Sequence, residues 1–321
     1  MLSHKKLLII DTICLCIILW ALAVKVSQSL PQPAKLFPPI PEPSQRPVVS
    51  DNNEPFISNT SDINKSSPAI GPAEVPPVKL PPTITALSYL VGNVVTGDVY
   101  LERNGNTALP VASMSKLVTA IAATDMLKAT TTILITPEEA DVPPDGSGLV
   151  AGERFTVGEL MYPLLLDSSN IAAEALASSS DRANFINQMN GYSWEIGMPH
   201  TYFADPTGIS PHNQATAEDF FALAKYLYNF RPDILALTRT IGTTTATTTD
   251  HGAHIFDSIH PFVTDQRFIG GKTGHTPEAG DTMLTILWIK GKPVAFIVIG
   301  SGNGERAQDT QMLIEKASAV I

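Results

Sequence analysis

The sequence predicts an α+β domain over residues 83–321, built as an antiparallel sheet flanked by helices with a helical insert. Two observations point to this class. Stretches rich in β-branched residues occur near both ends of the region, whereas its middle carries apolar patterns with helical spacing. Strands from both ends are therefore expected to share one sheet, with a catalytic cleft between the sheet and the inserted helices.

The domain is expected to begin with a β-hairpin and a buried helix. Leu87 to Val95 and Asp98 to Arg103 are β-rich and are joined across Thr96-Gly97, where glycine permits the turn. The stretch Met114 to Leu127 is apolar and rich in alanine, which is typical of a buried helix.

Helices are expected in the middle of the domain. They are predicted, after polar turns at 143–146, over Val157 to Leu166, Asn170 to Leu176, Arg182 to Ile196 and Ala217 to Tyr228. Thr216 with Asp219 three residues later is close to a capping box, which supports a helix start at that point.

The chain then returns to strands. Beyond the threonine-rich stretch Thr243 to Thr249, strands are predicted at Phe268 to Gly271, Met283 to Ile289 and Pro293 to Ile299. A helix over Ala307 to Ala319 closes the domain, so the late strands are free to pair with the early hairpin.

Residues 1–30 have the pattern of a signal peptide or an N-terminal membrane anchor. A basic start precedes the apolar run 7–24, which contains one charge, Asp11. At about 1.5 Å per residue this run spans roughly 27 Å, marginally enough to cross a bilayer. An uncleaved membrane anchor is favoured over a cleaved signal peptide, and both predict that the domain works outside the cytoplasm, in the cell envelope.

Residues 31–82 are predicted to be a disordered linker. They contain 14 of the 26 prolines and show neither a helical nor an alternating apolar period. A random extension would be disordered too, but a tether also explains why an apolar segment and a domain lie at its two ends.

Composition excludes several kinds of function for residues 83–321. Cys14 and Cys16 are the only cysteines, so disulfides, zinc-thiolate sites and thiol catalysis are excluded there. The region has 14 basic and 25 acidic residues, a net charge of −11, and such a surface disfavours binding to nucleic acid. The glycine-rich Gly300 to Gly304 fits no phosphate-loop fingerprint and is interpreted as a turn, and no cofactor is expected.

The first chemical motif is S-x-x-K at Ser113 and Lys116, near a predicted helix start. Residues three apart share a helix face, so the amine can take the proton of the hydroxyl. The helix N-terminus would stabilise the developing negative charge. The alternative is a capping serine followed by a solvated lysine, and the same pattern recurs at Ser3 to Lys6.

The second motif is S-x-N at Ser168 and Asn170. A hydroxyl and an amide two residues apart can point into one cleft, where the hydroxyl relays a proton and the amide holds a peptide group. Taken alone, the pattern is more typical of a helix cap.

The third motif is Lys272-Thr273-Gly274, between two predicted strands. Glycine lets a ligand backbone come close, while the lysine and threonine suit a terminal carboxylate. The alternative is a turn with an exposed lysine.

Together these motifs resemble a known set. With 55 residues from Ser113 to Ser168 and 104 from Ser168 to Lys272, they are similar to those of penicillin-binding proteins and serine β-lactamases. Thr96 to Tyr100, Phe203 to Ile209 and Lys272 to Thr276 further resemble the D-alanyl-D-alanine carboxypeptidase family, peptidase family S11. The resemblance covers about residues 84–318.

The resemblance implies the β-lactamase/D,D-peptidase-like transpeptidase fold and a serine-type D-Ala-D-Ala carboxypeptidase. Its substrates would be peptidoglycan stem peptides, and β-lactam antibiotics would be covalent inhibitors. The implied roles are Ser113 as acylated nucleophile, Lys116 as base, Ser168 as proton relay, Asn170 as substrate-positioning residue, Lys272, Thr273 and Gly274 as the carboxylate-binding strand, and the N–H groups of Ser113 and His275 as oxyanion hole. Burial beside Lys272 is expected to lower the pKa of Lys116.

Two departures and several alternatives remain open. Ile171 follows Asn170 where the family usually has a polar residue, so the hydrogen bonding of Asn170 is uncertain at this point. Neither the C-terminal β-domain nor the amphipathic tail of many relatives is expected after the last helix. The motifs do not decide between the carboxypeptidase and a D,D-endopeptidase that cuts peptide crosslinks, although His212 and Asn213 give slight support to the second. A β-lactamase is disfavoured, because the region at Asp205 to Gly208 lacks the glutamate of class A enzymes.

Two further interpretations come from other classes. A non-catalytic module that binds peptidoglycan or senses β-lactams would not need the complete set of motif residues, and that set is present here. His251, His254 and His260 could be considered as metal ligands, but their spacing fits no ligand pattern and a polar loop is expected instead.

Overall fold

The computed structural model describes residues 83–143 and 145–321. The predicted anchor (1–30, with the apolar run 7–24) and the predicted linker (31–82) lie outside the described residues. Across the part that is described, no helix has the length and apolar character needed to cross a membrane.

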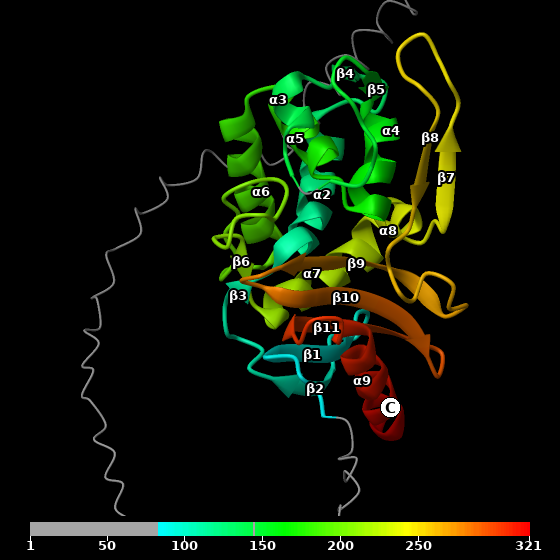
Figure 1. The fold of residues 1–321 in the computed structure, drawn as a ribbon. Coiled ribbons are helices and arrows are strands. Elements are labelled where there is room, and N and C mark those ends of the chain that lie inside the picture. Colours follow the sequence, from blue (N-terminus) through cyan, green and yellow to red (C-terminus); the bar gives the residue numbers. More distant parts are fainter. Residues whose placement is uncertain (1–82, 144) are drawn as a thin grey trace, which may run out of the picture. The chain divides into compact units, whose positions relative to one another are not determined.

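A five-stranded antiparallel sheet is built from both ends of the domain, as the sequence predicts (Figure 1). Its strands lie in the order β2-β1-β11-β10-β9. Their bounds are Ser88–Asn93 for β1, Val99–Arg103 for β2, Phe268–Thr276 for β9, Gly280–Ile289 for β10 and Lys292–Ser301 for β11. β1 pairs with β11, so the first and last strands of the chain meet at the middle of the sheet.

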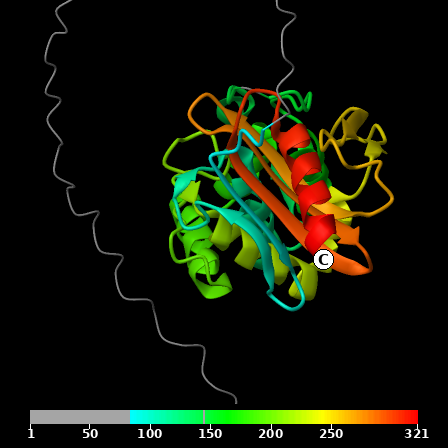
Figure 2. The ribbon, with the colours of Figure 1, turned by 90° about the horizontal axis from the view of Figure 1, so that it is seen from below.

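Helices cover both faces of this sheet. The C-terminal helix α9 (Arg306–Val320) lies across one face, as Figure 2 shows from below, and buries Leu313 and Ile314 against Val91 and Phe296. The other face packs against the helical part in a second, larger core that includes Leu284 of β10.

The helical part is formed by the middle of the chain. Its elements are the 3₁₀ turn η1 (Ala112–Ser115), α2 (Lys116–Met126), α3 (Pro137–Ala140), α4 (Val157–Tyr162), the π-helical turn η2 (Pro163–Asp167), α5 (Asn170–Ser178), α6 (Arg182–Ile196), α7 (Ala217–Phe230) and α8 (Pro232–Thr238). Three short strand pairs accompany them: β3 (Leu109–Pro110) with β6 (Gln214–Ala215), β4 (Thr132–Leu134) with β5 (Arg154–Thr156), and β7 (Gly242–Thr245) with β8 (His254–Asp257).

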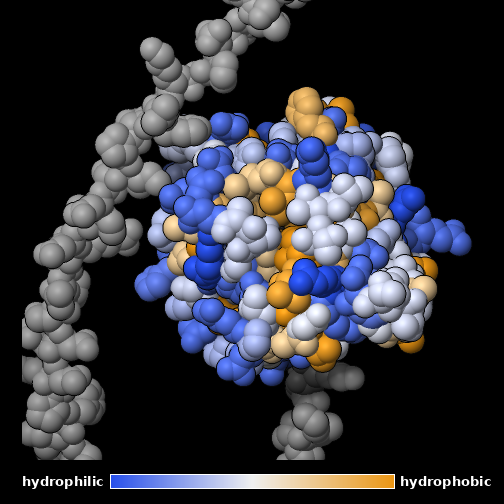
Figure 3. All heavy atoms as spheres, turned by 90° about the horizontal axis from the view of Figure 1, so that it is seen from above, coloured by the Kyte–Doolittle hydropathy of each residue, from blue (hydrophilic) through white to orange (hydrophobic). Residues whose placement is uncertain are grey.

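The predicted buried helix is the centre of this part. Every residue of α2 from Lys116 to Ala123 is buried, because other helices surround it. The surface that the helical part presents from above mixes hydrophilic and apolar residues (Figure 3).

The capping box predicted at Thr216 and Asp219 is present at the start of α7.

Three predicted boundaries that flank the motif residues were wrong. The helix expected from Met114 begins as the 3₁₀ turn η1, and the helix expected to Leu166 ends at Tyr162 and continues as the π-turn that starts with Pro163. The strand expected to end at Gly271 extends to Thr276, so Lys272 and Thr273 lie inside β9. Hydrogen bonding to β10, where Lys272 pairs with Leu284, maintains this strand although its glycines weaken the local β signal.

Candidate active site

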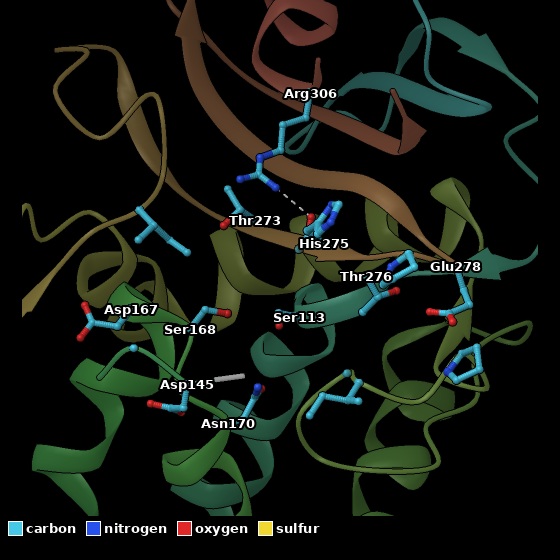
Figure 4. Close-up of a pocket in the computed structure, with 17 residues that line it drawn as sticks. Ser113, Asp145, Asp167, Ser168, Asn170, Thr273, His275, Thr276, Glu278 and Arg306 are labelled. Atoms are coloured by element: carbon cyan, nitrogen blue, oxygen red, sulfur yellow. Dashed lines mark hydrogen bonds between the residues drawn. The ribbon is translucent and has the colours of Figure 1, made fainter. Parts of the chain in front are cut away.

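The expected cleft is present between β9 and the helical part, with a volume of about 670 Å³. Six residues singled out from the sequence line it: Ser113, Ser168, Asn170, Thr273, Gly274 and His275. Figure 4 shows the first three on the helical side, facing Thr273 and His275 of β9. Lys116 and Lys272 are almost completely buried and do not line the cleft themselves.

A strained turn presents Ser113 to the cleft. The preceding residue, Ala112, has a φ of 50°, in the left-handed region that costs a non-glycine residue about 1 kcal/mol or more. The turn is held on either side, since Val111 donates its N–H to Asn213 and accepts the hydroxyl of Thr282 on β10. Strain of this kind is typical of functional sites.

Close packing brings β9 against the same turn. A Cβ atom added to Gly274 would lie 2.9 Å from the backbone nitrogen of Ser113 and 2.5 Å from the hydroxyl of Thr282. Only glycine fits this approach, which leaves the Ser113 N–H next to the end of β9 where His275 follows.

The amine of Lys116 is held by three acceptors. Its Nζ lies 2.9 Å from the hydroxyl of Ser113, 2.7 Å from the side-chain oxygen of Asn170 and 2.6 Å from the carbonyl oxygen of Thr207. All hydrogen-bonding capacity of an ammonium group is thus used, and one of its partners is the candidate nucleophile.

Burial lowers the pKa of Lys116 to about 7. The negative charges of Asp205, Asp145 and Glu174 act in the opposite direction and raise it. The amine is therefore close to half neutral at neutral pH, which suits a general base.

Lys272 lies beside the second motif. Its Nζ donates to the hydroxyl of Ser168 at 2.8 Å and to the carbonyl of Thr273 at 3.0 Å. Burial lowers the pKa of Lys272 well below its usual range, and the charge of Lys116 lowers it further. Burial lowers the pKa of Lys116, as expected from the sequence, whereas the repulsion between the two lysines lowers the pKa of Lys272.

The loop at Asp205 to Gly208 has a structural role that the sequence reasoning missed. The carboxylate of Asp205 accepts the N–H groups of Thr207 at 2.7 Å, Gly208 at 2.7 Å and Ser210 at 2.9 Å. This Asx turn aims the Thr207 carbonyl at Lys116, and an aspartate followed by threonine and glycine is a signal that could have indicated it.

Arg306, at the start of α9, lines the cleft and had no sequence signal. Its guanidinium donates to the carbonyl of Gly274 at 2.9 Å, the dashed line in Figure 4, and contacts Asp281. The ring of His275 is hydrogen-bonded to the same Asp281 at 2.8 Å. The cleft thus has a cation at the β9 wall in addition to the buried Lys272.

The three histidines are used in packing and hydrogen bonding. His251 stacks on Phe155 with 4.3 Å between ring centroids, and His254 is hydrogen-bonded to Glu153 at 2.8 Å. His260 is buried, and burial lowers its pKa to about 3. Among the residues that the structure places, no three His, Cys, Asp or Glu side chains form a candidate metal site.

Comparison with known proteins identifies the family. The family model for peptidase family S11, described as D-alanyl-D-alanine carboxypeptidase, matches residues 76–303. The chain belongs to this family. Membership explains why the three motifs of this S11 peptidase converge on one cleft.

Individual relatives agree with the assignment. A D-alanyl-D-alanine endopeptidase of Haemophilus influenzae is 30% identical over 242 residues, which cover 72% of this chain and 81% of that protein. A D-alanyl-D-alanine carboxypeptidase of Bacillus subtilis is 27% identical over 68% of this chain and 57% of its own.

The fold also matches a solved structure. Penicillin-binding protein D2 of Listeria monocytogenes, solved in its cefotaxime-bound form, is 28% identical with a TM-score of 0.65, covering 74% of this S11 chain and 98% of its own. The penicillin-binding-protein fold expected from the sequence is therefore confirmed.

Proposed function

We propose that this S11 peptidase is a serine-type D-Ala-D-Ala carboxypeptidase that acts on peptidoglycan stem peptides through an acyl-enzyme on Ser113. The observation that supports it most is the buried amine of Lys116, which has a pKa of about 7 and lies 2.9 Å from the Ser113 hydroxyl. A nucleophile and a base within hydrogen-bond reach are what acyl transfer requires.

The reaction follows from this geometry. Ser113 Oγ attacks the carbonyl carbon of the bond between the two D-alanines and passes its proton to Lys116 Nζ. The resulting oxyanion accepts from the N–H groups of Ser113 and His275. When the C–N bond breaks, Lys116 returns this proton to the leaving amine through the hydroxyl of Ser168, which Lys272 holds. Water then attacks the ester carbonyl, gives its proton to the neutral Lys116 amine, and the released Ser113 oxygen takes that proton back.

The terminal carboxylate of the substrate is recognised by the side of the cleft that β9 forms, the β9 wall. Thr273 supplies a hydroxyl at the surface of the cleft, and Gly274 lets the substrate backbone approach. The guanidinium of Arg306 lines the cleft and supplies the positive charge, while Lys272 lies buried behind the wall, where its amine holds Ser168. Asn170 holds a substrate peptide group from the opposite side.

A D,D-endopeptidase that cuts peptide crosslinks is the second candidate. The Haemophilus influenzae relative, which bears that name, favours it. Asn213 gives it less support than the sequence suggested, because its side chain is fully buried and caps the loop at Ala204 rather than facing the cleft. A non-catalytic binding module is disfavoured, because Lys116 is hydrogen-bonded to Ser113 and Lys272 to Ser168, as the proposed reaction requires.

The same proposal covers inhibitors and location. β-Lactam antibiotics are expected to acylate Ser113, in line with the cefotaxime-bound relative. The domain is proposed to act in the cell envelope, with residues 7–24 as its membrane anchor and 31–82 as its linker. No nucleic acid, metal or other cofactor takes part in the proposed reaction.

One experiment tests the proposal and chooses between the peptidases. The full chain is incubated with a fluorescent penicillin, and separately with crosslinked muropeptides and with uncrosslinked pentapeptides. A covalent label that Ser113→Ala removes and Ser179→Ala retains would support the acyl-enzyme. Release of D-alanine identifies a carboxypeptidase and separation of the crosslinked dimers an endopeptidase, whereas no label on the wild type contradicts both.

A further inference from the structure

The carboxylate of Asp145 reaches the N-terminus of α5 from a distant loop. Its Oδ2 accepts the N–H of Ile171 at 2.9 Å and the hydroxyl of Ser169 at 2.7 Å. Its Oδ1 accepts the N–H of Ser147 at 2.8 Å and the hydroxyl of the same residue. Both oxygens are therefore engaged by donors, and these donors come from two separate segments of the chain.

Ile171 takes part in this contact through its backbone. The side chain of Ile171 is buried in the hydrophobic core and can offer nothing to Asn170. The contact is made by its backbone N–H, which donates to Asp145. A carboxylate from another part of the chain thus holds the segment that carries Asn170.

The contact fixes the first turn of α5. Ser169 caps the helix by accepting the N–H of Ala172 at 3.0 Å, and Asp145 satisfies the preceding N–H. Asn170 lies between these two anchors and accepts the amine of Lys116 at 2.7 Å. A shift of this turn by one ångström would stretch that bond beyond hydrogen-bond range.

The charge of Asp145 also reaches the site. Burial acts to raise the pKa of Asp145, but hydrogen bonds from Ser147, Ile171 and Ser169 outweigh it and lower the pKa below its usual value. The group is therefore ionised at neutral pH. Its negative charge favours the protonated form of Lys116, as do the charges of Asp205 and Glu174, while Lys272 is the neighbouring cation.

We propose that Asp145 is a positioning residue for acylation, which holds the first turn of α5 so that Asn170 keeps the Lys116 amine against Ser113. The inference rests on the proposed function. Asp145 is not assigned a covalent or proton-transfer step, because its recorded hydrogen bonds go to Ser147, Ser169 and Ile171.

The test is Asp145→Asn in the full chain, with the rate of fluorescent-penicillin labelling measured between about pH 5 and about pH 10. The amide nitrogen opposes a donor, so labelling at the optimum should slow by about tenfold. The midpoint of the pH profile should move to lower pH, because a charge that favours protonated Lys116 is gone.

Asp181→Asn is the matched control. Asp181 caps α6 by accepting the N–H groups of Ala183 and Asn184 at an exposed position that does not line the cleft. Asp181→Asn also removes a carboxylate that caps a helix, but at a place away from the cleft. The rate and the midpoint of labelling should therefore stay those of the wild type.

The outcomes separate the inference from the proposed function. An unlabelled wild type contradicts both. If the wild type is labelled but Asp145→Asn has the wild-type rate and midpoint, the inference alone is overturned. The same holds if Asp145→Asn is labelled more slowly only in proportion to a loss of folded protein, with its midpoint unchanged. If Asp145→Asn does not fold, Ser147→Ala keeps the charge and should label about fivefold more slowly at an unmoved midpoint, and a wild-type rate there would overturn the inference.

Discussion

The amine of Lys116 lies 2.9 Å from the hydroxyl of Ser113, and the lysine is completely buried. Burial has a chemical consequence because the charged form of an amine is stabilised by water. The pKa of Lys116 falls to about 7, although three carboxylates oppose the shift. The Ser113 hydroxyl thus lies next to an amine that is mostly uncharged at a pH slightly above 7.

The rate of acylation should therefore rise with pH through a midpoint near 7. The pKa of the base is lowered, so its neutral form is present above about pH 7 and is lost below it. At about pH 5 the rate should be down roughly a hundredfold. Labelling by fluorescent penicillin across this range measures it, and a midpoint near 10, as for a solvated lysine, would contradict the role of Lys116.

Lys116→Arg provides the companion measurement. A guanidinium remains protonated at every pH of the experiment, so it can donate to Ser113 but cannot accept its proton. Labelling should be lost across the whole pH range. Residual labelling with the wild-type pH profile would show that another group is the base.

Ser168→Ala should slow turnover by about a hundredfold or more. The hydroxyl of Ser168 is the link between Lys272 and the leaving amine, and its loss also leaves the buried Lys272 amine with one acceptor fewer. The readout is release of D-alanine from a pentapeptide. Ser179→Ala is the control, because that hydroxyl only caps the end of α5, and a Ser168→Ala rate within about twofold of the wild type would exclude the relay.

Gly274→Ala should abolish labelling while the domain stays folded. The added methyl group would come within 3.0 Å of the Ser113 backbone nitrogen and of the Ala112 side chain, so β9 must move away from the nucleophile. Gly191→Ala is the matched control, since no atom lies within 4 Å of its added Cβ on α6. That change should leave labelling intact and stabilise the helix by about 0.5–1 kcal/mol. Equal labelling rates for the two variants would contradict the close approach.

Local patterns in the sequence were enough to predict much of the fold. α6 was predicted with its observed bounds, because Asp181 caps its start and Gly197 ends it in a left-handed conformation. The second half of β9 was missed, since three glycines remove the local β signal and only pairing with β10 makes the strand. α8 and the β7–β8 pair were also missed, because α8 is only seven residues long and β7 lies in a threonine-rich stretch with no clear period.

The site was predictable to the extent that its chemistry depends on side chains in known motifs. Ser113, Lys116, Ser168 and Lys272 were all singled out, and the structure brings them together. The carbonyl of Thr207 has no signature of its own, because any residue could supply a backbone oxygen, and only the turn around Asp205 that aims it can be recognised from the sequence. Asp145 is equally hidden in the sequence, since only the folded chain brings its loop to α5.

A last prediction concerns stability apart from catalysis. Asp309 of α9 is completely buried, and its carboxylate accepts the N–H and the hydroxyl of Thr85 and the N–H of Ala86, all at 2.8 Å. Asp309→Ala would leave these donors without their acceptor where the chain enters the sheet. We expect a loss of about 2–4 kcal/mol in the free energy of unfolding.

Thermal unfolding of the full chain measures this loss, with Glu315→Ala as control, because Glu315 lies on the exposed face of the same helix and should change stability by less than about 0.5 kcal/mol. At a temperature where Asp309→Ala is folded, penicillin should label it at the wild-type rate, since Asp309 does not line the cleft. Unfolding temperatures equal to that of the control would show that the Asp309 contacts do not hold the first strand. A reduced labelling rate in folded Asp309→Ala would instead show that the α9 side of the sheet is coupled to the cleft, through the one residue of α9, Arg306, that lines it.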